Sequence, residues 1–276
     1  MKKLILFLII CVISFCLFTF TACQSGSENA DKNENGKLIV AMELAYPPFE
    51  TKDNAGNPTG VSVDFAKDFG EYLGLEVEIV NTAWAGLIPS LQTGSADMVI
   101  SSMTITESRK QEVDFSDPYA NAYLAILTNK DSGVISVDDL NQPGKKVAVK
   151  EGTTGHMYAI NNLTNAEIIV LTDESACVTE VSQGKADGFL YDQLTIYRNN
   201  MNNPETTSAV FIPFQEVDSW GVAVKKGNTE LLDSLNAFIK KYNDEGGFDK
   251  LTDRYLKEER EAFEELGFKW FFDVSE

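Results

Sequence analysis

The chain contains 276 residues, and its 42 acidic and 23 basic side chains give a net charge of −19. Such a negative charge argues against nucleic acid or an anionic membrane surface as a partner. Of the four cysteines, Cys11 and Cys16 lie in an N-terminal apolar run, and Cys23 and Cys177 alone cannot form a disulfide framework or a zinc site. We therefore expect no metal or cofactor, and a fold held by its apolar core as one large domain or two moderate lobes.

The N-terminus has the pattern of a bacterial lipoprotein signal peptide. Two lysines are followed by the apolar run Leu4 to Phe20 and then by Thr21-Ala22-Cys23. The run is short for a membrane span. We expect cleavage of residues 1–22 and a lipid on Cys23, with Phe20 standing where such signals usually have leucine. Without the two lysines, the net charge becomes −21.

The first predicted strand follows a polar tether. Residues 23–36 are almost entirely polar or glycine, and we expect them to be disordered. Lys37 to Met42 then reads as a buried strand, which ends at Glu43 to Phe49, where two prolines impose an extended turn. Just past the strand end, Glu43 and Tyr46 either cover the core or face a ligand cleft.

Two helices and a strand come next. Residues 60–74 carry apolar side chains at helical spacing and stop at Gly74, and Glu76 to Val80 alternates as a strand. A second helix is predicted between Asn81 and Gly94. Trp84, at its start, either joins the core or stacks on a ligand side chain.

A short apolar run, Met98 to Ile100, leads into Ser101, Ser102 and Thr104, whose hydroxyls can hydrogen-bond a polar ligand. In an open α/β sheet, ligands bind just beyond the carboxyl ends of the strands. Five residues after Thr104, Arg109 either grips a carboxylate with its guanidinium fork or is an ordinary surface arginine beside other charges.

Two motifs in this region resemble those of a known family. Ser-Ser-Met-Thr-Ile-Thr-Glu-Ser-Arg (101–109) and Val-Asp-Phe-Ser-Asp-Pro-Tyr (113–119) look like the signature of family 3 bacterial solute-binding proteins, the polar amino-acid receptors of ABC importers. The similarity extends from about Lys37 to about Leu256.

An internal repeat indicates two similar units. Leu91-Gln-Thr-Gly-Ser-Ala-Asp97 is matched by Val181-Ser-Gln-Gly-Lys-Ala-Asp187, and each copy predicts a helix end, a glycine stop and a strand start. Ser101-Ser102 and Tyr191-Asp192 follow at equivalent strand ends, so they line one cleft if the two units face each other. The aspartates that close the two copies are expected to be structural.

A second candidate binding segment follows the predicted strand Lys146 to Val149. Lys150-Glu-Gly-Thr-Thr-Gly-His156 places hydroxyls and glycines before a helix predicted from Met157, which favours an anion site. Lys150 either contacts a polar ligand side chain or is solvated. His156 is expected to lie beside the helix start without a catalytic role.

The other predicted elements are a crossing segment at 120–128, strands at 209–213 and 220–224, helices at 229–242 and about 246–255, and an acidic helical tail at 257–276. Alternating strands and helices favour α/β lobes with mostly parallel sheets. The resemblance implies a periplasmic-binding-protein-like fold of two lobes, with two hinge crossings and a ligand cleft between the lobes. We place the first lobe at 37–123 plus 217–276 and the second at 124–216.

The resemblance also implies a clamp for a zwitterion. Arg109 and nearby hydroxyls would hold the α-carboxylate, and Asp192 would hold the α-ammonium or simply cap the next helix. Many family members have aspartate where this chain has Glu43. The expected ligand-binding residues are Glu43, Tyr46, Trp84, Ser101, Ser102, Thr104, Arg109, Lys150, Thr153, Thr154 and Asp192.

The expected function is that of an extracytoplasmic lipoprotein without catalytic activity. It would capture a free polar amino acid, with a cationic or amide side chain favoured, and deliver it to an ABC permease as a monomer. It would be anchored by its lipid to the outer face of the cytoplasmic membrane, or be periplasmic in a Gram-negative cell. The alternatives are a cyclohexadienyl-dehydratase-like enzyme and a surface adhesin or sensor on the same fold.

Overall fold

The computed structural model describes residues 36–211 and 213–274. The expected signal peptide (1–22), the lipid-bearing Cys23 and the tether up to Asn35 lie outside the described residues. Within the described ranges, no helix is both long and apolar enough to cross a membrane.

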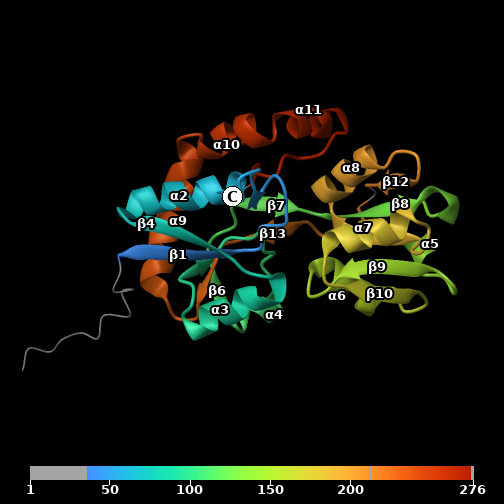
Figure 1. The fold of residues 1–276 in the computed structure, drawn as a ribbon, viewed down its shortest axis with the longest axis horizontal. Coiled ribbons are helices and arrows are strands. Elements are labelled where there is room, and N and C mark those ends of the chain that lie inside the picture. The colour runs from blue at the N-terminus through green and yellow to red at the C-terminus, as the bar shows by residue number, and fades with distance from the viewer. Residues whose placement is uncertain (1–35, 212, 275–276) are drawn as a thin grey trace, which may run out of the picture. The chain divides into compact units, whose positions relative to one another are not determined.

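Two five-stranded sheets organise the chain (Figure 1). The first has the strand order β4 (Glu76–Asn81), β1 (Lys37–Met42), β5 (Met98–Val99), β14 (Ala223–Lys225) and β6 (Val113–Phe115). The second has the order β10 (Glu167–Leu171), β9 (Lys146–Lys150), β11 (Gly188–Asp192), β8 (Leu124–Asn129) and β12 (Thr207–Val210). In each sheet one strand, β14 or β8, pairs antiparallel with both of its neighbours, and the remaining pairs are parallel. The predicted two-lobed α/β fold is therefore confirmed. The prediction of mostly parallel sheets is wrong, because β14 and β8 make half of the described strand pairs of the two sheets antiparallel.

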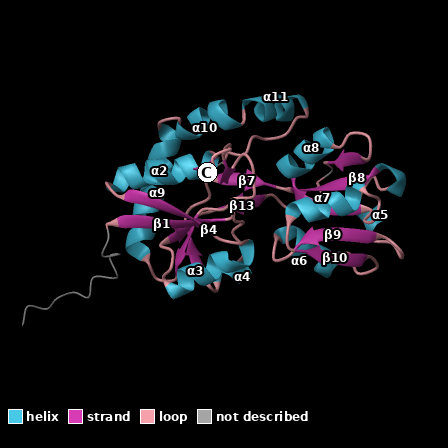
Figure 2. Ribbon diagram, in the orientation of Figure 1, coloured by secondary structure: helices cyan, strands magenta, loops and turns pink. Residues whose placement is uncertain are grey.

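Helices cover both faces of each sheet (Figure 2). In the first lobe these are α2 (Val61–Leu73), α3 (Leu87–Thr93) after the short η1 (Trp84–Gly86), α4 (Glu107–Lys110), α9 (Thr229–Asp244), α10 (Gly247–Tyr255) and α11 (Lys257–Glu265). In the second lobe these are α5 (Val137–Leu140), α6 (Thr154–Asn162), α7 (Glu174–Ser182) and α8 (Gln193–Asn202). Because both faces are covered, the central strands read as continuous apolar runs. Cys177 is fully buried on α7.

The repeat seen in the sequence is also a repeat of structure. Gly94 and Gly184 both adopt a left-handed backbone at the end of a helix, with φ of 75° and 70°. Asp97 then accepts from the Ile39 amide (2.7 Å), and Asp187 accepts from the Lys146 amide (2.8 Å). Each aspartate thus fastens a strand entrance to the neighbouring parallel strand, which confirms their structural role.

The two segments that connect the sheets lie side by side. β7 (Ala120–Ala122) and β13 (Asp218–Trp220) pair antiparallel, with Ala120 opposite Trp220. The predicted run 120–128 is therefore two strands that meet at Tyr123. Likewise, the predicted strand 220–224 is split between β13 and β14, and the strand predicted at 209–213 lies at Thr207–Val210. A short hairpin of β2 (Thr51–Lys52) and β3 (Pro58–Thr59) precedes α2.

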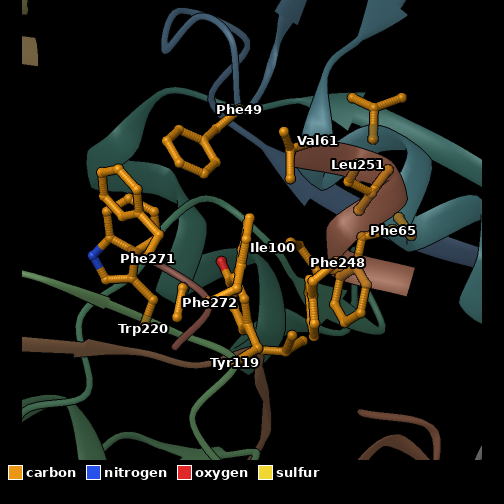
Figure 3. Packing of buried hydrophobic residues seen from close by; sticks show 14 of the residues in the cluster. Phe49, Val61, Phe65, Ile100, Tyr119, Trp220, Phe248, Leu251, Phe271 and Phe272 are labelled. Carbon is orange, nitrogen blue, oxygen red and sulfur yellow. The ribbon is translucent and has the colours of Figure 1, made fainter. Parts of the chain in front are cut away.

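The largest apolar cluster joins the N-terminal and C-terminal parts of the described chain. Phe49, close to β1, stacks edge to face with Trp220 and Phe271, at ring-centroid distances of 5.0 and 5.4 Å (Figure 3). Phe248 and Phe272 lie flat against each other at 4.7 Å. The tail predicted to pack on the first lobe does so, because its aromatic side chains complete that lobe's core.

The same tail also contacts the second lobe. We call α11 and residues 266–272 the C-terminal strap. Its Phe263 packs edge-on against Tyr197 of α8 at 5.8 Å, and its Phe268 packs against Tyr123 and Phe211 at 5.5 and 5.1 Å. The strap therefore contacts both lobes.

Candidate functional site

The carboxyl end of β1 leads into Glu43. Its amide donates to Ser101 Oγ (3.0 Å), and one of its carboxylate oxygens accepts from the Trp84 amide at the start of η1 (3.2 Å). The other oxygen pairs with the ammonium of Lys150, at the end of β9 in the second sheet. The two side chains are only 15% and 5% exposed. Since a buried charge without a partner is costly, each of these charges depends on the other.

Two serines lie at the carboxyl end of β5, as predicted. Ser102 has a positive φ of 47°, in the left-handed region that residues other than glycine rarely adopt. Ser101 Oγ and Ser102 Oγ donate to opposite oxygens of Glu50, at 3.3 and 3.2 Å. Ser62 Oγ of α2 donates to the same carboxyl group at 2.6 Å. Glu50 is therefore the hub of this turn.

Arg109 reaches across the two lobes. Thr106 caps α4 by accepting from the Arg109 amide (3.2 Å), which fixes the backbone of the arginine. The guanidinium donates to the carbonyl of Thr104 (2.7 Å) and to the carbonyl of Gly152 in the second lobe (3.1 Å), and it lies 5.1 Å from the Trp84 ring. Burial lowers the pKa of Arg109 to about 10, so the side chain remains a cation at neutral pH. Two of its five N–H groups are used, which leaves donors for a ligand.

The segment after β9 turns into α6 earlier than predicted. The helix begins at Thr154 and not at Met157, because the hydroxyl of Thr153 caps it by accepting from the His156 amide (3.4 Å). His156 Nδ1 accepts from the Gly152 amide (3.1 Å), so the histidine lies at the helix start, as predicted. The start of α6 packs tightly on β11, where a Cβ at Gly155 would lie 2.4 Å from a backbone oxygen of the strand.

Asp192 ends β11 and caps α8. Its Oδ1 accepts from the amides of Leu194 and Thr195, both at 3.0 Å. Its Oδ2 is buried, and within the described ranges it has no hydrogen-bond partner. The buried hydroxyl of Tyr46 has no hydrogen-bond partner there either, but it faces Asp192 closely enough to oppose the rise in the pKa of that carboxyl group. Burial raises the pKa of Asp192, so a cation beside Oδ2 would stabilise its ionised form.

These side chains enclose one cavity at the meeting point of the strand ends. Every predicted ligand-binding residue lines it except Lys150, which is held in its ion pair with Glu43. The lining residues that the sequence did not single out are Glu50, Ala122, Tyr123, Leu124, Asp218 and Trp220, together with Tyr191, which had been noted only as the neighbour of Asp192. Most of these residues lie on the two crossing segments. Because the cleft is expected beside the hinge, the sequence could have indicated the crossing residues as part of its lining. Glu50 gave no such signal.

Three further acidic groups share the surroundings of the cavity. Burial raises the pKa of Glu50 to about 8, that of Glu174 to about 7 and that of Asp218 to about 6. Arg109 opposes the rise at Asp218, and Lys150 opposes the rise at Glu174. The surroundings of the cavity thus combine two cations with an excess of carboxyl groups. Within the described ranges, no group of histidine, cysteine and acidic side chains has the arrangement of a metal site.

Comparison with known proteins identifies the family of the chain. Residues 38–258 match the family described as bacterial extracellular solute-binding proteins, family 3. The chain belongs to this family. It is 32% identical to the L-cystine-binding protein TcyJ of Escherichia coli strain K12 over 81% of this chain and 84% of that protein. It is 28% identical to the ABC transporter glutamine-binding protein GlnH of Bacillus subtilis strain 168, over 94% and 99% of the two chains.

A solved structure shows the same fold. The crystal structure of an ancestral amino acid-binding protein, described as a precursor of cyclohexadienyl dehydratase, is 38% identical and superposes with a TM-score of 0.73. The match covers 80% of this chain and 95% of that one. These three relatives are described as amino-acid-binding proteins, and members of the family are extracytoplasmic solute-binding proteins of ABC transporters.

Proposed function

We propose that this solute-binding protein captures a polar amino acid as a zwitterion and delivers it to an ABC permease without transforming it. The observation that carries this proposal is the unpartnered Oδ2 of Asp192, which is buried beside the same cavity as the Arg109 guanidinium. Asp192 Oδ2 accepts no hydrogen bond within the described ranges, although the Tyr46 hydroxyl faces its carboxyl group, and Arg109 is a cation with free donors. An α-amino acid supplies the missing partner to both.

The carboxylate and the ammonium of the ligand would be held by different lobes. Arg109 lies on α4, between β5 and β6 of the first sheet, and Asp192 ends β11 of the second. Thr104 and Thr154 would add hydroxyl contacts to the carboxylate, while Ser101, Ser102 and Thr153 mainly fix the turns. A ligand that pairs with both charges therefore bridges the lobes. Such a bridge favours closure of the cleft, because only the closed form satisfies both ends.

The rest of the ligand would lie among Glu43, Tyr46 and Trp84. Lys150 already pairs with Glu43 and lies 5.6 Å from the Trp84 ring, where the charge of a cationic ligand would otherwise go. A cationic side chain must displace this ammonium, whereas an amide can donate to Glu43 with the ion pair in place. We therefore place glutamine ahead of arginine and lysine as the ligand.

We also propose how the whole chain serves this function. Residues 1–22 would be a cleaved signal, Cys23 would carry the lipid and 23–36 would be the tether to the outer face of the membrane. Lobe one would comprise 37–123 plus 217–276, and lobe two would comprise 124–216. The paired β7 and β13 would form the hinge of a monomeric receptor, because both crossings pass through this ribbon.

The enzyme alternative has weaker support. A cyclohexadienyl dicarboxylic acid without an amino group would place no ammonium beside Asp192 Oδ2. The relative described as a precursor of cyclohexadienyl dehydratase is itself described as an amino acid-binding protein. An adhesin or sensor would use the same clamp.

A thermal-shift screen of the domain from Gly36 tests the proposal. The panel is the twenty amino acids with ornithine and cystine, on protein unfolded and refolded to remove carried-over ligand. A ligand at a hundred times its Kd should add about 2.7 kcal/mol to the free energy of unfolding. For a domain of this size, that is roughly 5 to 10 °C in Tm. No shift across the panel would contradict amino-acid binding.

A further inference from the structure

Glu50 is a buried acidic residue that the zwitterion clamp does not use. It is 1% exposed, yet it lines the cavity. Glu50 and Tyr46 form an isolated β-bridge, in which the Glu50 amide donates to the Tyr46 carbonyl at 3.0 Å. This bridge aims the Glu50 side chain inward. Three serine hydroxyls bond to its carboxyl group, and within the described ranges no lysine or arginine forms an ion pair with it. A carboxylate buried without a cation is costly, so protonation is the expected response.

The contacts of Glu50 reach the residues on which the ligand would depend. Ser102 holds a left-handed backbone that a β-carbon disfavours, and its bond to Glu50 opposes relaxation of that turn. Ser101 donates to Glu50 while it accepts from the Glu43 amide. The carboxyl group of Glu50 thus binds both serine hydroxyls, and through Ser101 it is connected to the backbone of Glu43.

We propose that Glu50 is a positioning residue of the ligand site, which carries a proton at neutral pH, fixes Ser101 and Ser102, and admits a ligand carboxylate only while it is neutral. This inference rests on the proposed function, since it requires that an amino acid binds. The chemical reason is that the carboxylate of the ligand would lie beside Ser102. A second negative charge behind that hydroxyl would repel it.

The titration of Glu50 can be separated from that of its neighbours. Burial raises its pKa to about 8, with the three serine hydroxyls opposing the rise and Glu43 adding to it. The other ionisable groups that face it are Tyr46, Tyr119 and Tyr191, and burial raises the pKa of all three well above 10. These tyrosines stay neutral through the range in which Glu50 loses its proton. Glu43 forms an ion pair with Lys150.

Ligand binding should weaken as the pH rises through the pKa of Glu50. Below pH 8 Glu50 is mostly protonated, and binding is intact. Above pH 8 the proton is lost, and at pH 9 about one molecule in ten keeps it. The affinity of the wild type should then fall about tenfold more between pH 7 and pH 9 than that of a variant without this group.

The test is isothermal titration with L-glutamine and L-arginine at pH 6.5, 7, 8 and 9. Glu50→Gln keeps a neutral group of the same shape, so its Kd should lack the extra tenfold alkaline loss. It should also bind at least tenfold more tightly than Glu50→Ala, which releases both serines. The ammonium of the free ligand titrates equally in every sample, so the ratio between variants removes its effect.

Ser62→Ala is the matched second variant. Ser62 does not line the cavity, and its hydroxyl lowers the pKa of Glu50. Its removal should move the alkaline loss of binding to higher pH. Wild-type protein that binds, together with a Glu50→Gln variant that has the same pH profile, would overturn this inference alone. Wild-type protein that binds no member of the amino-acid panel at pH 6.5 would overturn the proposed function and this inference with it.

Discussion

Asp192 offers a sharp test of the clamp, because its two oxygens have separate roles. Oδ1 caps α8 through two amide hydrogen bonds of 3.0 Å, and Oδ2 is the unpartnered acceptor at the cavity. Asparagine caps helices as well as aspartate does, so Asp192→Asn should keep the cap through its carbonyl oxygen. Its NH2 group would replace Oδ2 and cannot accept a proton from an ammonium. The substitution should therefore remove binding and leave the fold.

The magnitude follows from the burial of the group. Removing one partner of a buried charge pair costs about 2–5 kcal/mol of binding, or roughly 30- to 5,000-fold in Kd. Isothermal titration with the amino acid that gives the largest thermal shift measures this loss. Without ligand, the Tm of Asp192→Asn should stay close to the wild-type value.

Asp192→Ala is the matched control, because it removes both oxygens. Loss of the cap should cost about 0.5–2 kcal/mol, or roughly 1–8 °C in the Tm of the ligand-free protein. Binding should fall as far as in Asp192→Asn. If Asp192→Asn keeps its Kd within threefold of wild type, Oδ2 does not receive the ammonium and the clamp is wrong.

Three other substitutions test neighbouring parts of the structure. Arg109→Ala should weaken amino-acid binding by about 2–5 kcal/mol in titration calorimetry, with Arg109→Lys intermediate because it keeps the charge without the fork; an unchanged Kd would refute the carboxylate role. Lys150→Met should improve binding of arginine at least tenfold relative to glutamine, since the competing ammonium is gone from Glu43; an unchanged ratio would show that Lys150 does not set specificity. Gly155→Ala should lower the free energy of unfolding in urea by about 1–3 kcal/mol, because its methyl group would lie 2.4 Å from the Leu190 carbonyl; wild-type stability would show that α6 can shift.

Local sequence signals predicted the scaffold of the site well. The glycine stops and the hydroxyls after β5 and β9 depend on neighbours a few residues away, so their placement could be inferred from the chain itself. The N-caps at Thr153 and Asp192 belong to the same class, although the start of α6 was placed three residues late. Its cap lies inside a run of glycines and hydroxyls that offers several starting points.

Pairings between distant segments could not be predicted. The ion pair of Glu43 and Lys150 joins residues that are 107 positions apart and belong to different lobes. The sequence indicates each of them only as a separate ligand contact. Glu50 read as a polar residue beside a turn, since nothing in its neighbours along the chain shows that three serines surround it. These interactions depend on how distant segments pack in three dimensions. Local sequence patterns do not specify that packing.

The C-terminal strap has a consequence for how the domain assembles. Phe271 shares a core cluster with β1, so the first strand of the described residues completes its packing only when residues near position 271 are present. Contacts of such long sequence separation form late and slow the folding of a chain. A nascent chain that has not yet reached Phe272 lacks part of the first lobe's core, while every strand of the second lobe is already available. A tag fused close to the strap would interfere with this final step, whereas one placed before Lys37 would not.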